Sequence, residues 1–215
     1  MLRFKNVIAF TSDMDFRKEE LWAKVKGVYV GLDPDSMVTS PFGEADVYIG
    51  GFLRDRHFGP TMKAGKRDRH LYVGGTEIIN RRQWSAIASE ELEQIAEKMG
   101  HTEVKAEWVG ANLELEGIPN LSELPPGTYI EINPGSDDAA VLMVQDQIKP
   151  CGAPGEVIAA QYAGQEPTTT FQDAAPRGKR GLVGDVDKPG NIKIGHEVRI
   201  SFPHYITDAQ LEPFR

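Results

Sequence analysis

Short stretches in which apolar and polar side chains alternate make up most of this chain, and Gly and Pro residues separate them. Residues 22–30 are rich in Val and aromatic side chains, and Lys24 and Lys26 alternate with apolar positions, as expected for a half-buried β-strand. A similar stretch at 4–10 predicts an antiparallel partner for it. Two more strands are predicted at 45–51 and 71–75, and the polar, Gly-containing stretch between them is predicted to be a loop.

The same pattern continues in the second half of the chain. Further strands are predicted at 104–109, 113–115, 128–132, 139–148, 181–186 and 192–202. The segment 156–162 fits a short helix or a strand, and the polar segment 165–175 predicts a mobile loop. Short strands with turn residues between them favour a β-barrel or a sandwich. We therefore expect a mainly β fold with a few helices, in a single domain over residues 1–215.

One segment has the period of an α-helix. Between residues 90 and 99, apolar side chains recur at the i, i+3, i+4, i+7 spacing of one buried helix face. Ser89 precedes this segment as the expected N-cap, and Gly100 follows it. We expect the helix to cover the sheet.

Composition and charge limit the classes of function. The chain has 215 residues, of which 40% are hydrophobic, so it can build one substantial core. Its net charge of -8 opposes non-specific binding to nucleic acid or to an anionic membrane, so an anionic ligand has to be held by a local group of basic side chains. No apolar run approaches the roughly 20 residues that cross a bilayer. A single cysteine cannot form a disulfide framework. Together with the lack of a long apolar run, this predicts a soluble, cytoplasmic protein without a signal peptide.

The single cysteine, Cys151, follows the predicted strand 139–148 and precedes Gly152. A side chain at the end of a strand is presented on an irregular loop by a rigid support, where functional sites are commonly built. A cysteine without a partner forms no intramolecular disulfide, and nearby positive charge favours a reactive thiolate. The alternative is structural, because free cysteines are among the most buried residue types and pack as small apolar side chains.

The predicted loop from Arg54 to His70 is strongly basic. It holds six Lys or Arg and two Asp, although the chain as a whole is acidic. Guanidinium groups bind phosphate and carboxylate through paired hydrogen bonds, so the loop is a candidate anion site, with a solvated basic loop as the alternative. Arg81-Arg82 and residues 177–180 add two basic clusters that could meet on one anion.

Signatures of common enzyme and metal sites are missing. None of the five histidines forms a His-x-His or His-Glu-x-x-His pair, and there is no Cys-x-x-Cys, so the tetrahedral zinc pattern is absent. The Gly-x-Ser-x-Gly elbow and the glycine-rich phosphate loops are also absent. His57 and His70 bracket the basic loop and could bind an anion or act as an acid or base, with simple exposure as the alternative.

Several short motifs follow one another along residues 45–200. They are Asp55-Arg56-His57-Phe58-Gly59, Asn80 to Ile87, Gly110-Ala111-Asn112-Leu113, Leu124 to Ile132, Pro150-Cys151, Gly178-Lys179-Arg180-Gly181 and Gly190 to Val198. In order and spacing they resemble the MOSC domain, the family related to the C-terminal part of molybdenum cofactor sulfurases. Two positions depart from the family pattern: Arg54 stands in place of Gly, and Lys179 in place of Arg.

The resemblance implies a mostly antiparallel β-barrel with a few helices. It also implies that Cys151 carries sulfur as a persulfide or binds molybdenum, since a soft thiolate suits both roles. The residues expected to bind molybdenum cofactor are Arg56, His57, Arg81, Arg82, Asn112, Lys179 and Arg180. The basic pocket for its pterin phosphate is expected from the Arg and Lys residues of this set. The larger sulfurases carry a pyridoxal-phosphate half for which this chain has no room, so no bound pyridoxal phosphate is expected.

Three hypotheses about function follow. The first is a stand-alone MOSC protein that binds molybdenum cofactor through Cys151 and reduces N-hydroxylated small molecules, with electrons from a separate donor because no flavin, haem or iron-sulfur motif is visible. The second is a sulfur carrier that receives a persulfide on Cys151 from a separate cysteine desulfurase and passes it to an acceptor. The third is a non-catalytic β-barrel that binds an anion or a partner protein, with Cys151 in packing only. The residues favour no particular oligomeric state.

Overall fold

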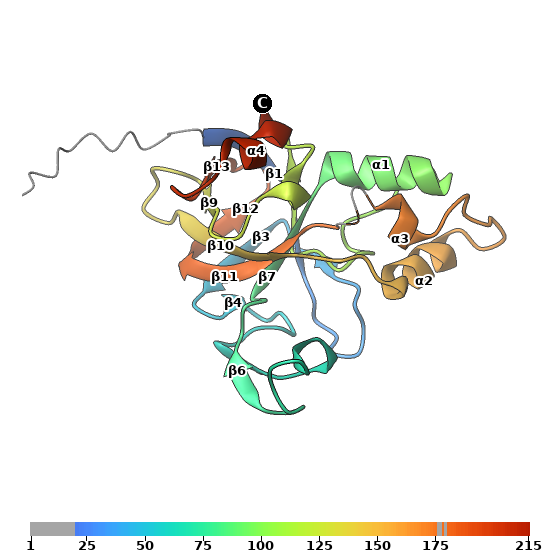
Figure 1. The fold of residues 1–215 in the computed structure, drawn as a ribbon, viewed down its shortest axis with the longest axis horizontal. Coiled ribbons are helices and arrows are strands. Elements are labelled where there is room, and N and C mark those ends of the chain that lie inside the picture. Colours follow the sequence, from blue (N-terminus) through green and yellow to red (C-terminus); the bar gives the residue numbers. More distant parts are fainter. Residues whose placement is uncertain (1–19, 176–177, 179) are drawn as a thin grey trace, which may run out of the picture.

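Seven strands close into a barrel in the computed structural model, which describes residues 20–175, 178 and 180–215 (Figure 1). In order around the ring they are β1 (Glu20–Val30), β13 (Glu197–Ser201), β9 (Tyr129–Ile132), β10 (Ala140–Gln147), β11 (Leu182–Lys188), β7 (Trp84–Ala88) and β8 (Leu113–Glu116). The ring closes because β1 pairs with both β13 and β8. Neighbouring strands are antiparallel except for β7 and β8, which are parallel. The expected mainly β barrel is confirmed.

Smaller elements extend the barrel. β2 (Ser40–Pro41) pairs with β1, and β12 (Gly190–Lys193), β3 (Glu44–Tyr48) and β4 (Gly51–Phe52) form a second sheet. A segment that we call the arm (residues 59–80) projects at the bottom of Figure 1 and carries β5 (Thr61–Lys63), the 3-10 helix η1 (Lys66–Asp68) and β6 (Glu77–Ile79). The remaining short helices are η2 (Leu121–Glu123), α4 (Asp208–Leu211) and η4 (Glu212–Phe214).

The barrel interior is filled by the apolar positions whose alternation predicted the strands. On β1, Val25 and Val28 are buried, whereas Lys24 is exposed. The register between β1 and β8 shifts between Val25 and Gly27, so this irregularity changes which positions of β1 face inward. Burial of each such aliphatic side chain stabilises the fold by roughly 1.5–3 kcal/mol.

Three helices cover one flank of the barrel, at the right of Figure 1: α1 (Ser89–Met99), α2 (Gly152–Gln161) and α3 (Phe171–Ala174). Ile95 of α1, Ile158 of α2 and Phe171 of α3 belong to one apolar cluster beside the barrel. Every helix of the described part falls short of the length and apolar character needed to cross a membrane.

The helix predicted at 90–99 is confirmed as α1, but its N-cap is Ala88 instead of Ser89. The Ser89 hydroxyl donates to Glu114 Oε1 on β8 at 2.7 Å, so it ties the helix to the barrel. The segment 156–162 is helical as part of α2, which begins earlier, at Gly152.

Two predicted strands are wrong. Residues 71–75 form turns in the arm, where Leu71 and Val73 are exposed. Residues 104–109 form no strand, and Val104 and Val109 pack in the apolar cluster beside the barrel. Apolar residues occur at strand-like spacing in both segments, but no neighbouring strand pairs with them.

The structure adjusts two other predictions, and a third lies outside the described residues. The segment 165–175 contains α3, with Phe171 buried. The predicted strand 192–202 is divided, because β12 and β13 are separated by a turn in which Gly195 has a φ of +89°. The strand predicted at 4–10 lies outside the described residues.

Candidate functional site

Cys151 lies between the end of β10 and the start of α2, as the residue that caps the N-terminus of α2. Its half-buried side chain lines a cavity of about 350 Å³. The N-terminus of a helix favours negative charge. The thiol is therefore not sealed in the apolar core, as the packing alternative would require.

The cavity brings together most of the residues that the sequence placed in the site. Five of them line it together with Cys151: Arg56, His57, Arg82, Asn112 and Arg180. They all lie close to strand ends, after β4 or shortly before β7, β8 and β11. The closed barrel therefore gives these loop residues a rigid support.

Two of the predicted residues are not brought to this cavity. Arg81 is exposed, and its Nη1 donates to Gln145 Oε1 at 3.1 Å outside the cavity. Its neighbour Arg82 lines the cavity, so the two side chains of this pair serve different places. Lys179 lies outside the described residues.

Arg180 brings a positive charge to the Cys151 thiol. Its Nη1 donates to the carbonyl oxygen of Val109 at 2.7 Å, while its buried Nε has no hydrogen-bond partner among the described residues. Burial lowers the pKa of Arg180, and the neighbouring Cys151 side chain acts in the opposite direction. The positive charges of Arg67 and Arg82 lower it further. A guanidinium in this environment can accept an anionic ligand with little loss of other contacts.

Arg67, on η1 of the arm, lines the same cavity, although sequence reasoning placed it only in the basic loop and not in the site. Burial lowers the pKa of Arg82, and the charge of Arg67 lowers it further, with Asp146 and Asp68 acting in the opposite direction. The positive charges of these two guanidinium groups repel each other, and an anion bound near both relieves this repulsion.

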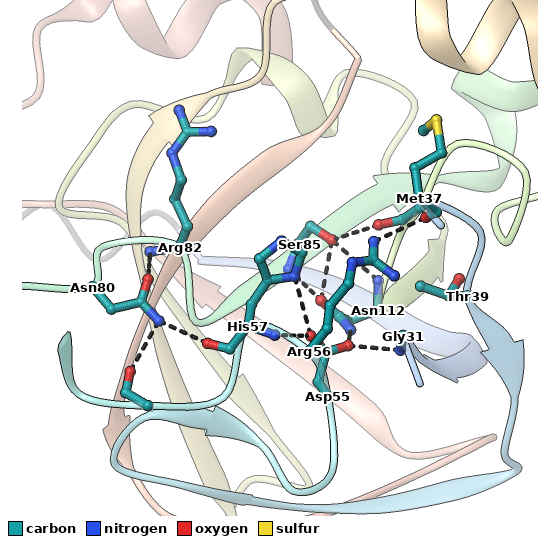
Figure 2. A network of polar contacts seen from close by, with 12 residues as sticks. Gly31, Met37, Thr39, Asp55, Arg56, His57, Asn80, Arg82, Ser85 and Asn112 are labelled. Carbon is teal, nitrogen blue, oxygen red and sulfur yellow. Dashed lines mark hydrogen bonds and ion pairs between the residues drawn. The ribbon is translucent and has the colours of Figure 1, made fainter. Parts of the chain in front are cut away.

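Asp55 is the buried centre of the polar network in Figure 2, and it was not among the predicted site residues. Its carboxylate accepts hydrogen bonds from Gly31 N at 2.7 Å and from Asn112 Nδ2 at 2.8 Å. It also accepts from His57, through the backbone N at 2.8 Å and through Nδ1 at 3.1 Å. Burial alone would raise the pKa of Asp55, but the hydrogen bonds from His57, Gly31 and Asn112 outweigh burial and lower it.

The contact with Asp55 selects the tautomer of the His57 ring. An ionised carboxylate only accepts hydrogen bonds, so Nδ1 of His57 carries a proton. The second ring nitrogen, Nε2, is then left for a ligand, and half of the side chain is exposed next to the cavity. In the sequence, the order Asp55-Arg56-His57 was the signal that could have identified Asp55 as part of the site.

Arg56 shapes one wall of the cavity. Its Nη2 donates to the carbonyl oxygen of Met37 at 2.9 Å, and its Nη1 to that of Val38 at 3.3 Å (Figure 2). Met37 itself lines the cavity. Because two nitrogens of the guanidinium hold backbone carbonyls, Arg56 positions this wall more than it offers free donors to a ligand.

Comparison with known proteins identifies the family. The MOSC domain model matches residues 53–199, which include Cys151 and the other residues of the cavity from Arg56 to Val183. YuaD of Bacillus subtilis (strain 168) is 37% identical over 182 residues, which cover 85% of this chain and 92% of that protein. Its name refers to metal-sulfur cluster biosynthesis.

Solved structures agree with this assignment. A crystal structure of YuaD from Bacillus subtilis matches with a TM-score of 0.78 and 37% identity, covering 86% of this chain and 100% of that chain. YiiM from Escherichia coli matches with a TM-score of 0.54 and 17% identity, covering 90% of this chain and 76% of that chain, and at this identity the match shows a shared fold. The chain with its Cys151 cavity therefore belongs to the MOSC domain family.

Proposed function

We propose that this MOSC protein binds molybdenum cofactor, with Cys151 as the protein ligand to molybdenum, and reduces N-hydroxylated small molecules with electrons from a separate donor. One observation carries the proposal: the Cys151 thiol lies beside Arg180 in a cavity that three further arginines line. MOSC domains are associated with molybdenum cofactor sulfurases, and this association supports the choice of cofactor.

The residues of the cavity fit the chemistry of this cofactor. The unpartnered Nε of Arg180 and the paired charges of Arg67 and Arg82 suit a phosphate group. A thiolate is a soft ligand that suits a transition metal. The described residues contain no group of three or more His, Cys, Asp or Glu side chains that could hold a metal ion, so further ligands would come from the dithiolene sulfurs of the cofactor.

The part played by the chain is to bind and orient. When bound, the cofactor supplies two-electron transfer of an oxygen atom. Cys151 would hold the metal, and Arg82 and Arg180 would bind the phosphate. His57 lines the cavity, where its Nε2 would bind an anion or move a proton. The overall reaction takes two electrons from the donor and two protons, removes the hydroxyl oxygen as water and leaves the amine.

A second candidate function is favoured by the name of YuaD, which refers to metal-sulfur cluster biosynthesis. As a sulfur carrier, the Cys151 thiolate attacks the outer sulfur of a persulfide on a separate desulfurase. The sulfur-sulfur bond of the donor breaks, a new one forms on Cys151, and the donor leaves as a thiolate. Arg180 would stabilise the anionic persulfide on Cys151.

Metal analysis together with intact mass distinguishes these candidates. The protein is purified without oxygen from cells that are supplied with molybdenum cofactor. Molybdenum in equal amount with the chain supports the reductase, whereas an extra sulfur atom on Cys151 without metal supports the sulfur carrier. Absence of both would contradict both proposals and leave a barrel that binds an anion or a partner without catalysis.

A further inference from the structure

A second cavity, of about 600 Å³, adjoins the cavity of Cys151. The two cavities share four lining residues: Arg56, His57, Arg67 and Arg82. The rest of the second cavity is lined by Phe58, by Asn80 and by residues of the arm from Thr61 to Asp68. It therefore adds a separate space next to the site, on the side of the arm.

The lining of this second cavity combines apolar surface with basic groups. Phe58 is 43% exposed, and Met62 is half-buried, so both offer apolar surface to a ligand. Lys66 is exposed and has no ion-pair partner among the residues that the structure describes. Lys63 lies 3.9 Å from Glu77, but both side chains are well exposed, and such pairs contribute little.

One acidic residue, Asp68, also lines the cavity and offsets part of this charge. Asp68 Oδ2 accepts a hydrogen bond from the backbone N of Gly65 at 2.8 Å, so it is engaged within the arm. Five cationic side chains outnumber it around the cavity: Arg56, Lys63, Lys66, Arg67 and Arg82. A cationic ligand would meet repulsion here, and a neutral one would leave the charges without partners.

We infer that this second cavity binds the substrate of the site, and that the substrate is an organic anion with an apolar body. Its carboxylate or phosphate group lies near Lys63 and Lys66, which line only this cavity, and its apolar part rests against Phe58 and Met62. The end that reacts points past His57 toward Cys151. The link to Cys151 rests on the proposed function, whereas binding of the anion does not. Exposed lysines at the cavity also suit a ligand that enters and leaves, in contrast to a cofactor that stays.

Calorimetric titration with phenyl phosphate, an aromatic body with one anionic group, tests the binding. The full chain is used, both without molybdenum and loaded with the cofactor. Inorganic phosphate supplies the charge alone, and benzyl alcohol supplies the apolar body alone. Phenyl phosphate is expected to bind about tenfold more tightly than either, because charge and apolar contact each contribute on the order of 1 kcal/mol or more.

Two variants assign the binding to the second cavity. Lys66→Ala and Met62→Ala, which line only this cavity, are expected to weaken phenyl phosphate binding by about five- to tenfold. Arg69→Ala removes a basic side chain of the same arm that lines neither cavity, and it is expected to leave the affinity unchanged. Circular dichroism verifies that each variant is folded, and none of them should change the molybdenum content.

Equal affinity in wild type, Lys66→Ala and Met62→Ala would overturn the inference. Binding that is present without molybdenum but lost in the loaded protein would overturn it too, because the cavity would then belong to the cofactor. A chain that never holds molybdenum but keeps the expected pattern of phenyl phosphate binding would contradict the proposed function alone and support the anion site.

Discussion

Asp55 ties together three segments of the chain beside the cavity. It accepts hydrogen bonds from Gly31, from Asn112 just before β8, and from the backbone N and the ring Nδ1 of His57. Since Gly31 and Asn112 are buried, loss of the carboxylate would leave Gly31 N without its acceptor and would leave Asn112 Nδ2 with only the longer contact to the carbonyl oxygen of Tyr29, at 3.3 Å. The geometry of the cavity thus depends on a residue that does not line it.

Asp55→Ala is expected to lower the free energy of unfolding by about 2–4 kcal/mol, because buried donors lose a charged acceptor. Urea unfolding of the variant and wild type measures the difference. Asp187→Ala, at an exposed position of β11, is the matched control and should change stability by less than about 0.5 kcal/mol. A similar small effect at Asp55 would contradict its place in the network.

The pair Arg81-Arg82 offers a second test at the scale of single residues. Arg82→Ala is expected to reduce the molybdenum content of the purified protein about tenfold, because a charged donor to the phosphate is lost. Arg81→Ala changes the same kind of residue one position earlier, where the side chain contacts Gln145 instead of the cavity. It should keep the content of the wild type, and equal losses in both variants would count against the site.

Glu91 gives the protein a pH-dependent stability. It is buried in α1 and accepts hydrogen bonds from Ser122 N at 2.8 Å, Ser122 Oγ at 2.9 Å and Ala88 N at 3.3 Å. Burial raises its pKa from 4.5 to about 7, with these hydrogen bonds acting in the opposite direction. The folded state therefore holds a proton that the unfolded state has released between these two values.

Stability is expected to fall as the pH rises through this window, with a loss of about 3 kcal/mol from Glu91 alone above pH 7. Below the lower value the carboxyl is protonated in both states, and the penalty disappears. Urea unfolding at a series of pH values measures the slope. Glu91→Gln should remove much of it and the exposed control Glu93→Gln should not; an unchanged slope in Glu91→Gln would be the contradicting result.

The sequence could identify the main side chains of the site but not their directions. The ordered motifs led to Cys151, to Arg82 and to Arg180 through their resemblance to the MOSC family pattern. They could not separate Arg81 from Arg82, since the direction of each side chain is set by the turn before β7, where Asn80 Oδ1 accepts from Arg82 N at 2.9 Å. Arg67 was missed because its segment was predicted only as a loop, and nothing in a loop prediction says that the chain folds back to the cavity.

At the scale of elements, the site depends on how β11 meets β7. Gly181 stands between Arg180 and β11, with a φ of +96°, and a Cβ there would lie 2.2 Å from the carbonyl oxygen of Ala86 on β7. Gly195 provides a comparison, because it has a φ of +89° but no atom within 4 Å of an added Cβ. Substitution of Gly195 therefore measures the free-energy cost of the positive φ alone, whereas substitution of Gly181 adds the cost of the clash with β7.

Gly181→Ala is expected to lower the free energy of unfolding by about 2–4 kcal/mol, whereas Gly195→Ala should cost only about 1–2 kcal/mol. Thermal or urea unfolding of both variants checks this order. Because the clash moves Arg180, Gly181→Ala should also weaken anion binding in the Cys151 cavity. Equal costs at the two glycines would mean that the close approach to β7 does not constrain the site.

The elements that could be predicted were the ones with long, regular patterns. β1, β10 and α1 show several periods of alternation or of helical spacing, and all three are present. The segments 71–75 and 104–109 misled because a few apolar residues in a row also suit an exposed turn or a buried irregular segment. What decides between them is the presence of a neighbouring strand, and this is a property of the whole fold.

At the scale of the whole molecule, closure of the barrel could be expected from the family pattern, but the alternation of residues alone left a sandwich equally open. Closure requires β1 to pair with β13 across most of the chain and β7 to run parallel to β8 with α1 between them. Such pairings join residues far apart in sequence, where local preferences carry little information. The same closure gathers basic groups of an acidic chain around one cavity.

The central claim is that Cys151 in this cavity holds the metal of a bound cofactor. The most direct test compares the molybdenum content per chain of Cys151→Ser and wild type, both purified without oxygen from cells supplied with the cofactor. We expect molybdenum to fall to background in the variant, while its melting temperature without cofactor stays that of the wild type. Equal molybdenum in the two proteins would contradict the claim.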